Sequence, residues 1–356
     1  MKLKKFVYGI LAGMIAFGAA TDTTSAMSRQ EISQIKVSKS GNFKYWNKDS
    51  EARQKLVAYV KDVTNKSGKN FIPIEDRIAV FDMDGTFLCE TAPSYFNRML
   101  YIHRVLHDKN FTPSPEDKKF ATEFEKALKE KKSTVKLGSS TRYQISTFFG
   151  MTLEDYANCV EDFMRTPVEG LKNLKWGEAF YLPMVEVIKY LQANDFKVFV
   201  VSGTERQTIR ILLGDMLKIP PENVIGTDVQ FLATNQGDTD GEKYLFDKSD
   251  KLIRGGILVK NSQMNKVSAI ERNIGRQPVL AFGNSSGDLS MLNYTISGNK
   301  HKSAAFFILC DDLEREFGNE NVATKDKKLA DDNGWNTVSM KYDFKTIYGD
   351  DVKVER

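Results

Sequence analysis

The sequence has little cysteine and little histidine. Its 356 residues include only three of each. Cys89, Cys159 and Cys310 are too few and too scattered for a disulfide framework or a zinc site, and the last two could pair only if the fold brought them together. His103 and His107 are four residues apart and would share one face of a helix, but no third metal ligand is near them. These absences exclude a disulfide scaffold and a zinc protease helix.

The sequence also has no excess of charge of one sign. It contains 51 Lys and Arg against 47 Asp and Glu, for a formal net charge of +4. This balance gives no support to nucleic-acid binding, which needs a strongly basic surface. Hydrophobic residues make up 41% and charged residues 28%, as in ordinary globular proteins, and the length allows one large domain or two moderate ones.

The N-terminus has the pattern of a secretory signal peptide. Three lysines precede an apolar segment from Phe6 to Ala20, which is too short and too early for a membrane span. Cleavage is expected after Ala26 or after Ala20, and an uncleaved anchor is the alternative. The sequence therefore predicts a periplasmic or secreted bacterial protein with no membrane contact beyond export.

Residues 78–86, IAVFDMDGT, form the most informative segment. The apolar run predicts a strand buried on both faces, with Asp82 and Asp84 at its carboxyl end. Side chains alternate along a strand, so both carboxylates can point the same way, bind one hard cation and divide nucleophilic and acid/base roles. An ordinary Asp-Gly turn is the competing interpretation. A similar DTDG at 238–241 has no strand before it, which favours a solvated loop at a hairpin tip.

The rest of the chain predicts alternating strands and helices around a helical insertion. A signal peptide is expected over 1–26, and an N-terminal arm and helix over 27–75. An α/β core is expected over 76–92 and 178–356, including a strand over 223–231 and a hairpin over 244–259. Residues 93–177 are strand-poor and predict a helical cap over the site. The alternation predicts a doubly wound, Rossmann-like parallel sheet.

Polar residues follow the buried strands, and a doubly wound sheet brings such strand ends to one edge. Ser202 and Gly203 can donate hydrogen bonds to a phosphoryl group at the start of a helix, although a helix cap would use the same residues. Lys266 can neutralise the phosphoryl charge, and Lys260 is the alternative because the loop length is open. With the carboxylates, this set predicts phosphoryl chemistry.

The order of these motifs resembles that of the haloacid dehalogenase superfamily. DMDGT is similar to its first motif, VVSGT to the second, Lys266 in MNKVSAI to the third, and FGNSSGD to the fourth. The resemblance extends to YWNKDS near residue 45 and to the GWNTVSMK tail, as in exported bacterial members related to phosphoserine phosphatases. It implies an inserted cap and Mg²⁺-dependent hydrolysis of a small phosphomonoester. Asp84 argues against dehalogenation, because the dehalogenating members lack that second carboxylate.

The resemblance also implies an aspartyl-phosphate mechanism. Asp82 would attack phosphorus, while Asp84 would protonate the leaving oxygen and then deprotonate water. Mg²⁺ would be held by Asp82, by the backbone carbonyl of Asp84, and by Asn284 or Asp288. Asn284 departs from the family pattern, where Asp is more usual, so Asp288 is expected to matter more.

The expected partner is a small phosphorylated metabolite that the cap selects. Phosphoserine and phosphocholine are two candidates by resemblance, and a phosphatase of broad specificity is equally possible. Glu90, on the segment entering the cap, and Arg142, which can grip a carboxylate or a phosphate, are the candidate specificity residues. A phosphotransferase with the same intermediate, or a phosphate-ester binding protein that has lost the chemistry, are the alternatives. The sequence does not predict the oligomeric state.

Overall fold

The computed structural model describes residues 26–355, so most of the expected signal peptide lies outside the described residues. The helices are α1 (Arg29–Ser33), α2 (Glu51–Thr64), α3 (Phe96–Leu106), α4 (Pro115–Lys129), α5 (Ser140–Ser146), α6 (Leu153–Met164), α7 (Leu182–Ala193), α8 (Arg206–Leu213), α9 (Met264–Ile274), α10 (Leu289–Ile296) and α11 (Glu320–Asn333). The strands are β1 (Ile78–Phe81), β2 (Leu171–Lys172), β3 (Lys197–Glu205), β4 (Val224–Ala233), β5 (Leu252–Val259), β6 (Leu280–Gly283), β7 (Ala304–Leu309), β8 (Asn336–Ser339) and β9 (Lys353–Val354). Short 3-10 helices span Ile74–Asp76, Val135–Leu137, Trp176–Glu178, Pro221–Asn223 and Ser286–Asp288.

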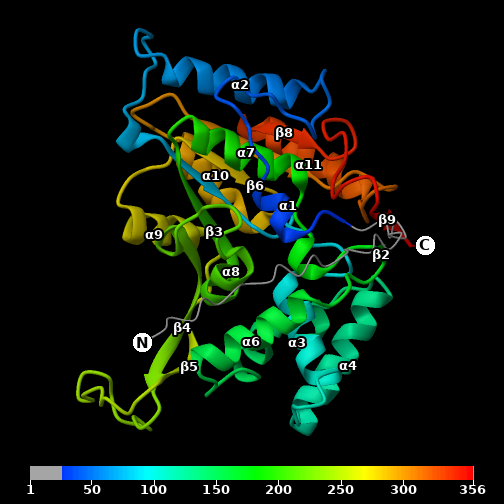
Figure 1. Ribbon diagram of the computed structural model, residues 1–356, viewed down its shortest axis with the longest axis vertical. Coiled ribbons are helices and arrows are strands. Elements are labelled where there is room, and N and C mark those ends of the chain that lie inside the picture. The colour runs from blue at the N-terminus through cyan, green and yellow to red at the C-terminus, as the bar shows by residue number, and fades with distance from the viewer. Residues whose placement is uncertain (1–25, 356) are drawn as a thin grey trace, which may run out of the picture.

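Seven strands form one sheet, in the order β5-β4-β3-β1-β6-β7-β8 (Figure 1). Every neighbouring pair is parallel except β4 and β5. The chain runs outward from β1 through β3 and β4, then returns to the other side of β1 with β6. This confirms the predicted doubly wound α/β fold. The strand order reverses beside β1, which is where open sheets of this kind bind ligands.

Alternating side chains of β1 face two different helix layers. Ala79 and Phe81 belong to the core that includes residues of α2, α7 and α8, whereas Ile78 and Val80 belong to the core beneath α9, α10 and α11. All four side chains are at most 2% exposed. Because both faces are covered, the strand is apolar throughout, and the first polar side chain emerges only where the strand ends.

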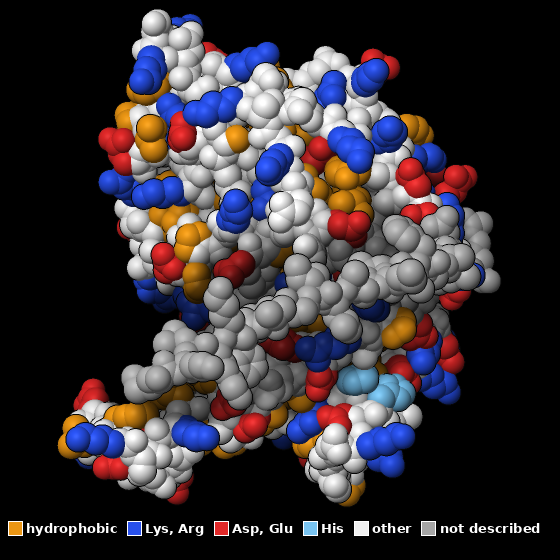
Figure 2. All heavy atoms as spheres, in the orientation of Figure 1, with side chains coloured by type: hydrophobic (Ala, Val, Ile, Leu, Met, Phe, Trp, Pro, Cys, Tyr) orange, Lys and Arg blue, Asp and Glu red, His pale blue; other side chains and the backbone are white. Residues whose placement is uncertain are grey.

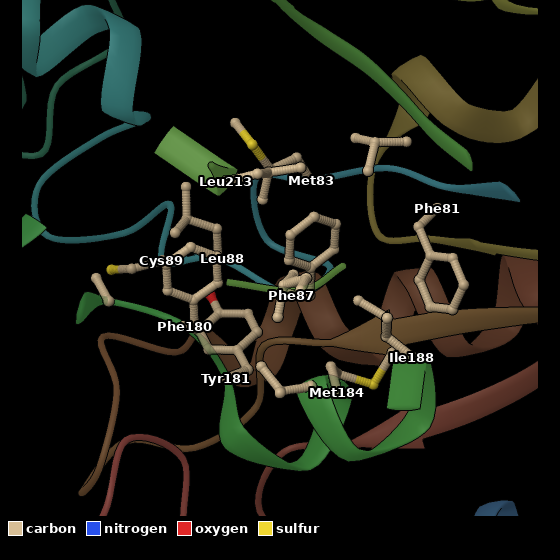
Figure 3. Packing of buried hydrophobic residues seen from close by; sticks show 14 of the residues in the cluster. Phe81, Met83, Phe87, Leu88, Cys89, Phe180, Tyr181, Met184, Ile188 and Leu213 are labelled. Atoms are coloured by element: carbon tan, nitrogen blue, oxygen red, sulfur yellow. The ribbon is translucent and has the colours of Figure 1, made fainter. Parts of the chain in front are cut away.

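Helices α3 to α6 form the predicted helical cap, inserted between β1 and α7, and they lie below the sheet in Figure 1. Two linkers join this cap to the core, and their backbones pair: Cys89 N donates to Ala179 O at 2.9 Å, and Tyr181 N donates to Phe87 O at 2.9 Å. Figure 3 shows Phe87 and Phe180 packed together between these linkers and α7, and their ring centroids lie 6.3 Å apart. The apolar contact holds the segment after β1 in place. The linker boundaries at 93 and 177 stay a prediction.

The predicted hairpin over 244–259 is wrong in its placement. The antiparallel pair is β4 with β5, which matches Ala233 with Leu252, and the loop over 234–251 joins them. Residues 244–251 are in this loop, whose apolar Leu245 and Phe246 are exposed rather than strand-paired. The DTDG segment lies in the same loop, so its interpretation as a solvated hairpin tip is confirmed. Figure 2 shows this hairpin projecting from the body of the protein.

One of the sequence-based questions is answered by the described residues. All three cysteines are free thiols, so Cys159 and Cys310 form no disulfide. Within residues 26–355, no helix combines the length and the apolar character that crossing a membrane requires.

Candidate active site

A cavity of about 270 Å³ lies where the carboxyl ends of β1 and β3 face the cap. Asp82 follows β1 directly, and its N–H donates to Phe282 O of β6 at 2.9 Å, so the central sheet positions its backbone. The core and the first linker contribute Asp82, Asp84, Glu90, Ser202, Gly203, Thr204, Lys260, Asn261, Ser262, Lys266, Ser285, Ser286, Gly287 and Asp288 to the walls. The cap side contributes Tyr95, Asn97, Arg98, Ser140, Thr141 and Gln144.

Lys266 lies between two buried carboxylates. Its Nζ donates to Asp82 Oδ1 and to Asp288 Oδ1, both at 2.6 Å. The side chains of Lys266, Asp82 and Asp288 are 2%, 8% and 1% exposed, respectively. Burial and the charge of Asp288 raise the pKa of Asp82 to about 7, although Lys266 acts in the opposite direction. Burial alone would lower the pKa of Lys266, but Asp288 and Asp82 raise it, so the lysine stays charged.

Asp84 has one bonded and one free carboxylate oxygen. Thr204 Oγ1 donates to Asp84 Oδ2 at 2.7 Å, whereas Asp84 Oδ1 is buried without a hydrogen-bond partner. Burial raises the pKa of Asp84, and the bond from Thr204 only partly opposes this. A raised pKa favours the protonated form of a carboxyl group, which is the direction that suits a general acid.

The end of β3 supplies hydrogen-bond donors to the cavity. Thr204 N donates to Ser202 Oγ at 3.2 Å, which leaves the Ser202 hydroxyl hydrogen free to donate elsewhere. Lys260 Nζ donates to the backbone oxygen Gly203 O at 2.8 Å. The ion pairs with the buried carboxylates are made by Lys266. The sequence offered two lysines as the phosphate-binding residue. Lys266 contacts the carboxylates, whereas Lys260 forms a hydrogen bond to the backbone beside Ser202.

The loop after β6 is organised around Asp288. Its Oδ2 accepts from the backbone N–H of Asn284 at 3.1 Å, and from the backbone N–H and the hydroxyl of Ser285 at 3.0 and 3.1 Å. Gly283 gives it room, because a Cβ there would lie 2.6 Å from Asp288 Cβ. Asn284 Oδ1 accepts from Thr86 Oγ1 at 3.2 Å. Both candidates for the last metal position are therefore already hydrogen-bonded within the protein.

Arg142, a predicted substrate-binding residue, lies away from the cavity in this structure. Arg142 does not line the cavity, its side chain is 77% exposed, and its nearest acidic partner is Glu116 at 3.9 Å. Helix α5 instead presents Ser140 and Gln144, which are four residues apart and share a helix face that Arg142 does not. His103 lies on α3 and His107 caps the C-terminal end of this helix, and both are outside the cavity lining.

The cavity also has cap residues that sequence reasoning missed. The Arg98 guanidinium lies 4.3 Å from the ring centroid of Tyr95, which holds it in place. Asn97 Nδ2 donates to Gln144 Oε1 at 2.7 Å, and Gln144 Nε2 donates to Ser140 Oγ at 2.8 Å. The contact between Asn97 and Gln144 joins α3 to α5 across 47 residues of sequence, so no local pattern marks it.

A divalent cation fits the chemistry of this cavity. Its inner groups offer oxygen donors, and the buried Asp84 Oδ1 and Glu90 Oε2 have no hydrogen-bond partner. Within residues 26–355, no three His, Cys, Asp or Glu side chains form a closed metal-binding cluster. A cation here would keep positions open for a backbone carbonyl, water or a substrate oxygen, which is the coordination that Mg²⁺ prefers.

The sheet and its cavity define the class of protein: a doubly wound α/β core with a polar cavity at the carboxyl end of its central strand, covered by a helical cap. Residues 79–293 match the family model of the haloacid dehalogenase-like hydrolases, so the chain belongs to this family. The sequence resemblance to this superfamily is thereby confirmed. No protein among the curated ones matches the chain.

Solved structures are similar to the chain at low sequence identity. A functionally unknown protein from Anaerococcus prevotii is 14% identical, with a TM-score of 0.50 over 83% of this chain and 92% of its own. Cytosolic 5'-nucleotidase IIIB bound to cytidine is 15% identical, with a TM-score of 0.45 over 82% and 86%. A phosphoserine phosphohydrolase-like protein from Francisella tularensis is 16% identical, with a TM-score of 0.33 over 65% and 87%. At such identities the similarity concerns the fold alone.

Proposed function

We propose that this hydrolase is a Mg²⁺-dependent phosphatase that cleaves small phosphomonoesters through a phosphorylated Asp82. The observation that carries the proposal is the pair of aspartates after β1, of which Asp82 forms an ion pair with Lys266 while Asp84 accepts a hydrogen bond from the neutral hydroxyl of Thr204. The two carboxyl groups thus differ in environment, which is the condition for one to attack and the other to donate a proton.

The first step divides the work between the two aspartates. One Asp82 oxygen attacks phosphorus, an O–P bond forms, and the bond between phosphorus and the leaving oxygen breaks. Asp84 transfers its proton to that oxygen, so an alcohol leaves. The Ser202 hydroxyl and the Lys266 ammonium lie in the same cavity and would hold the phosphoryl oxygens.

The second step regenerates the enzyme. Asp84, now ionised, takes a proton from water, and the resulting hydroxide oxygen bonds to phosphorus while the O–P bond to Asp82 breaks. Inorganic phosphate leaves, and Asp84 is protonated again. The raised pKa of Asp84 supports this role, because burial increases the proton affinity of its carboxylate.

Mg²⁺ is the proposed cofactor, and it would supply positive charge to the phosphoryl oxygens and the nucleophile. Asp82 would hold it with a carboxylate oxygen and Asp84 with its backbone carbonyl. Asn284 and Asp288 are the proposed neighbours on the β6 side. A cation would also keep Asp82 ionised near neutral pH, where burial otherwise favours its protonated form.

The size and lining of the cavity support a small, polar substrate. A volume of about 270 Å³ lies near the lower end of ligand-binding pockets. Most lining groups are hydroxyl, amide or charged, and the cap side adds Arg98 and the Asn97–Gln144 pair. We therefore propose a small phosphorylated metabolite whose leaving group contacts the cap.

The proposal is tested by hydrolysis of p-nitrophenyl phosphate with and without Mg²⁺. Wild type should release phosphate only with the metal, and Asp82→Asn should lose this activity while its melting curve stays cooperative. Trapping of radiolabelled phosphate on the protein, lost in Asp82→Asn, would identify the intermediate, and adding alcohols as acceptors separates a hydrolase from a phosphotransferase. No metal-dependent turnover of any ester in a panel of phosphorylated metabolites would refute the proposal.

We also propose that the protein is exported and processed, on the basis of its lysine-rich and apolar N-terminus. N-terminal sequencing of the protein from fractionated bacteria tests this. A mature chain that starts at residue 21 or 27 supports export, whereas an intact N-terminus in the cytoplasmic fraction would refute it.

A further inference from the structure

Glu90 lies closer to the reaction centre than its position in the first linker suggests. Its carboxylate packs on the backbone of Gly85, the residue after Asp84. A Cβ at Gly85 would lie 2.3 Å from Glu90 Cδ and 2.0 Å from Asn284 Nδ2, and Gly85 has a φ of +76°. Only glycine leaves room at this position for the Glu90 and Asn284 side chains to meet beside Asp84.

The contact with Glu90 occupies the Asn284 amide. Asn284 Nδ2 donates to Glu90 Oε1 at 2.8 Å, and its Oδ1 accepts from Thr86 at 3.2 Å. The assignment of the two amide atoms follows from these partners, because Thr86 can donate and an ionised Glu90 can only accept. Glu90 lines the cavity and Asn284 does not. The acidic group that faces the cavity at this point is therefore the carboxyl group of Glu90.

Two carboxylates in the cavity have no cation of their own. Lys266 is shared by Asp82 and Asp288. Asp84 and Glu90 each keep one buried oxygen without a partner, and within residues 26–355 no lysine or arginine forms an ion pair with either of them. Buried carboxylates without a counter-charge are unfavourable, so this arrangement favours binding of a cation that the protein does not itself supply.

We propose that Glu90 supplies the acidic charge of the cation site that the neutral Asn284 does not, and that Asn284 is the positioning residue that holds Glu90 there. This deepens the proposed function, on which it rests for the identity of the cation. The site would then contain Asp82, Glu90 and the backbone of Asp84, with the Asn284 amide fixing the Glu90 carboxylate against Gly85.

The test measures Mg²⁺ binding without substrate, by calorimetry and by the rise of the melting temperature with added MgCl₂. Glu90→Gln should weaken Mg²⁺ binding by roughly tenfold or more, as for other residues around metal sites. Asn284→Asp should lower the melting temperature of the metal-free protein, because it places two carboxylates at a contact that is now 2.8 Å. Glu116→Gln is the matched control on the exposed side of the cap and should leave Mg²⁺ binding unchanged.

The decisive variant exchanges the two groups. In Glu90→Gln/Asn284→Asp the hydrogen bond is reversed, with the new amide donating to the new carboxylate, and one negative charge is retained. Because the retained charge then lies at position 284, which does not line the cavity, Mg²⁺ affinity should stay roughly tenfold or more below that of wild type. Because the pair stays complementary, this variant also decides the matter if a single variant does not fold.

Two results would overturn the inference. One is unchanged Mg²⁺ affinity in Glu90→Gln together with a raised KM, which would place Glu90 at a positive group of the substrate instead. The other is an exchange variant that folds, by near-ultraviolet circular dichroism, and recovers wild-type Mg²⁺ affinity, which would place the acidic ligand at position 284. Failure of the proposed function is distinguishable: a wild type that binds Mg²⁺ through Glu90 but hydrolyses no phosphomonoester would refute the phosphatase proposal and support this one.

Discussion

The substitution Lys266→Met tests how the reaction centre is held together. Methionine has a similar length and no charge, so the change removes both 2.6 Å contacts, to Asp82 and to Asp288, without opening a large cavity. Both carboxylates are less than a tenth exposed and would lose their only cation. The variant should therefore be destabilised, and the loss should depend on pH.

The expected magnitude follows from burial. Removing one partner of a buried ion pair costs about 3–5 kcal/mol. Asp288 keeps its three hydrogen bonds from Asn284 and Ser285. At a pH at which Asp82 is protonated, we therefore expect a loss in the free energy of unfolding near the lower end of this range, about 3 kcal/mol. The pKa of Asp82 is about 7 with Lys266 present, and it should rise further without it.

The pH dependence has a definite sign. A carboxyl group whose folded-state pKa lies above its unfolded value binds a proton on folding, and the associated stability is lost as pH rises toward the folded pKa. In Lys266→Met the loss of stability with rising pH continues above pH 7, because the pKa of Asp82 is higher in this variant. In wild type the loss ends near pH 7. The difference in free energy of unfolding should thus be larger at about pH 8.5 than at about pH 6, by at most about 1.4 kcal/mol per pH unit.

Urea denaturation of both proteins at the two pH values, without metal, measures this difference. Lys260→Met is the matched control, since Lys260 makes only a backbone contact at 2.8 Å, and it should cost less than about 1 kcal/mol at either pH. Loss of phosphatase activity by roughly a hundredfold should accompany Lys266→Met. A loss of stability below about 1 kcal/mol, or one that is equal at both pH values, would refute the reasoning.

Three further predictions concern the fold around the site. Arg254→Met leaves the Glu205 carboxylate buried without its ion pair, and it should lower the free energy of unfolding in urea by about 3–5 kcal/mol. Part of this loss should be recovered when Glu205→Gln is added. An equal loss in the single and the double variant would contradict this account. Gly85→Ala should lower the melting temperature more than Gly138→Ala, because both glycines have positive φ but only at Gly85 would a Cβ meet atoms within 2.0 Å. Burial raises the pKa of Glu186 from 4.5 to about 7, although two backbone N–H groups of the N-terminal arm donate to it. Wild-type stability should therefore fall as pH rises through that range and Glu186→Gln should show a smaller fall, and identical pH profiles would show that Glu186 contributes nothing.

The strands of the core could be predicted because they are buried on both faces. Segments such as IAVF and LAFG are apolar without interruption, and they are the strands β1 and β6. The same criterion failed at YLF in residues 244–246, where an apolar run lies in the exposed loop between β4 and β5. A short apolar run is ambiguous, because exposure depends on whether another layer covers it.

The two specificity candidates show where sequence reasoning stopped. Glu90 and Arg142 were singled out for their charge and approximate location. The structure places Glu90 against Asn284, 194 residues away, and turns Arg142 outward on α5. Helix rotation and a contact over that separation are set by packing between elements, and no local pattern encodes either.

The sequence by itself determined the chemical groups of this protein and their order: two aspartates after a buried strand, then a serine, then a lysine, then an Asn/Asp loop. That was sufficient for the fold class and the family, because buried strands and the polar residues that follow them are local features. Only the tertiary structure decided how the groups are paired. It shares Lys266 between Asp82 and Asp288, and it leaves Asp84 and Glu90 each with an unpartnered oxygen. The physical reason is that charge pairing depends on distances of a few ångström between distant segments, which packing of the sheet, linkers and cap sets.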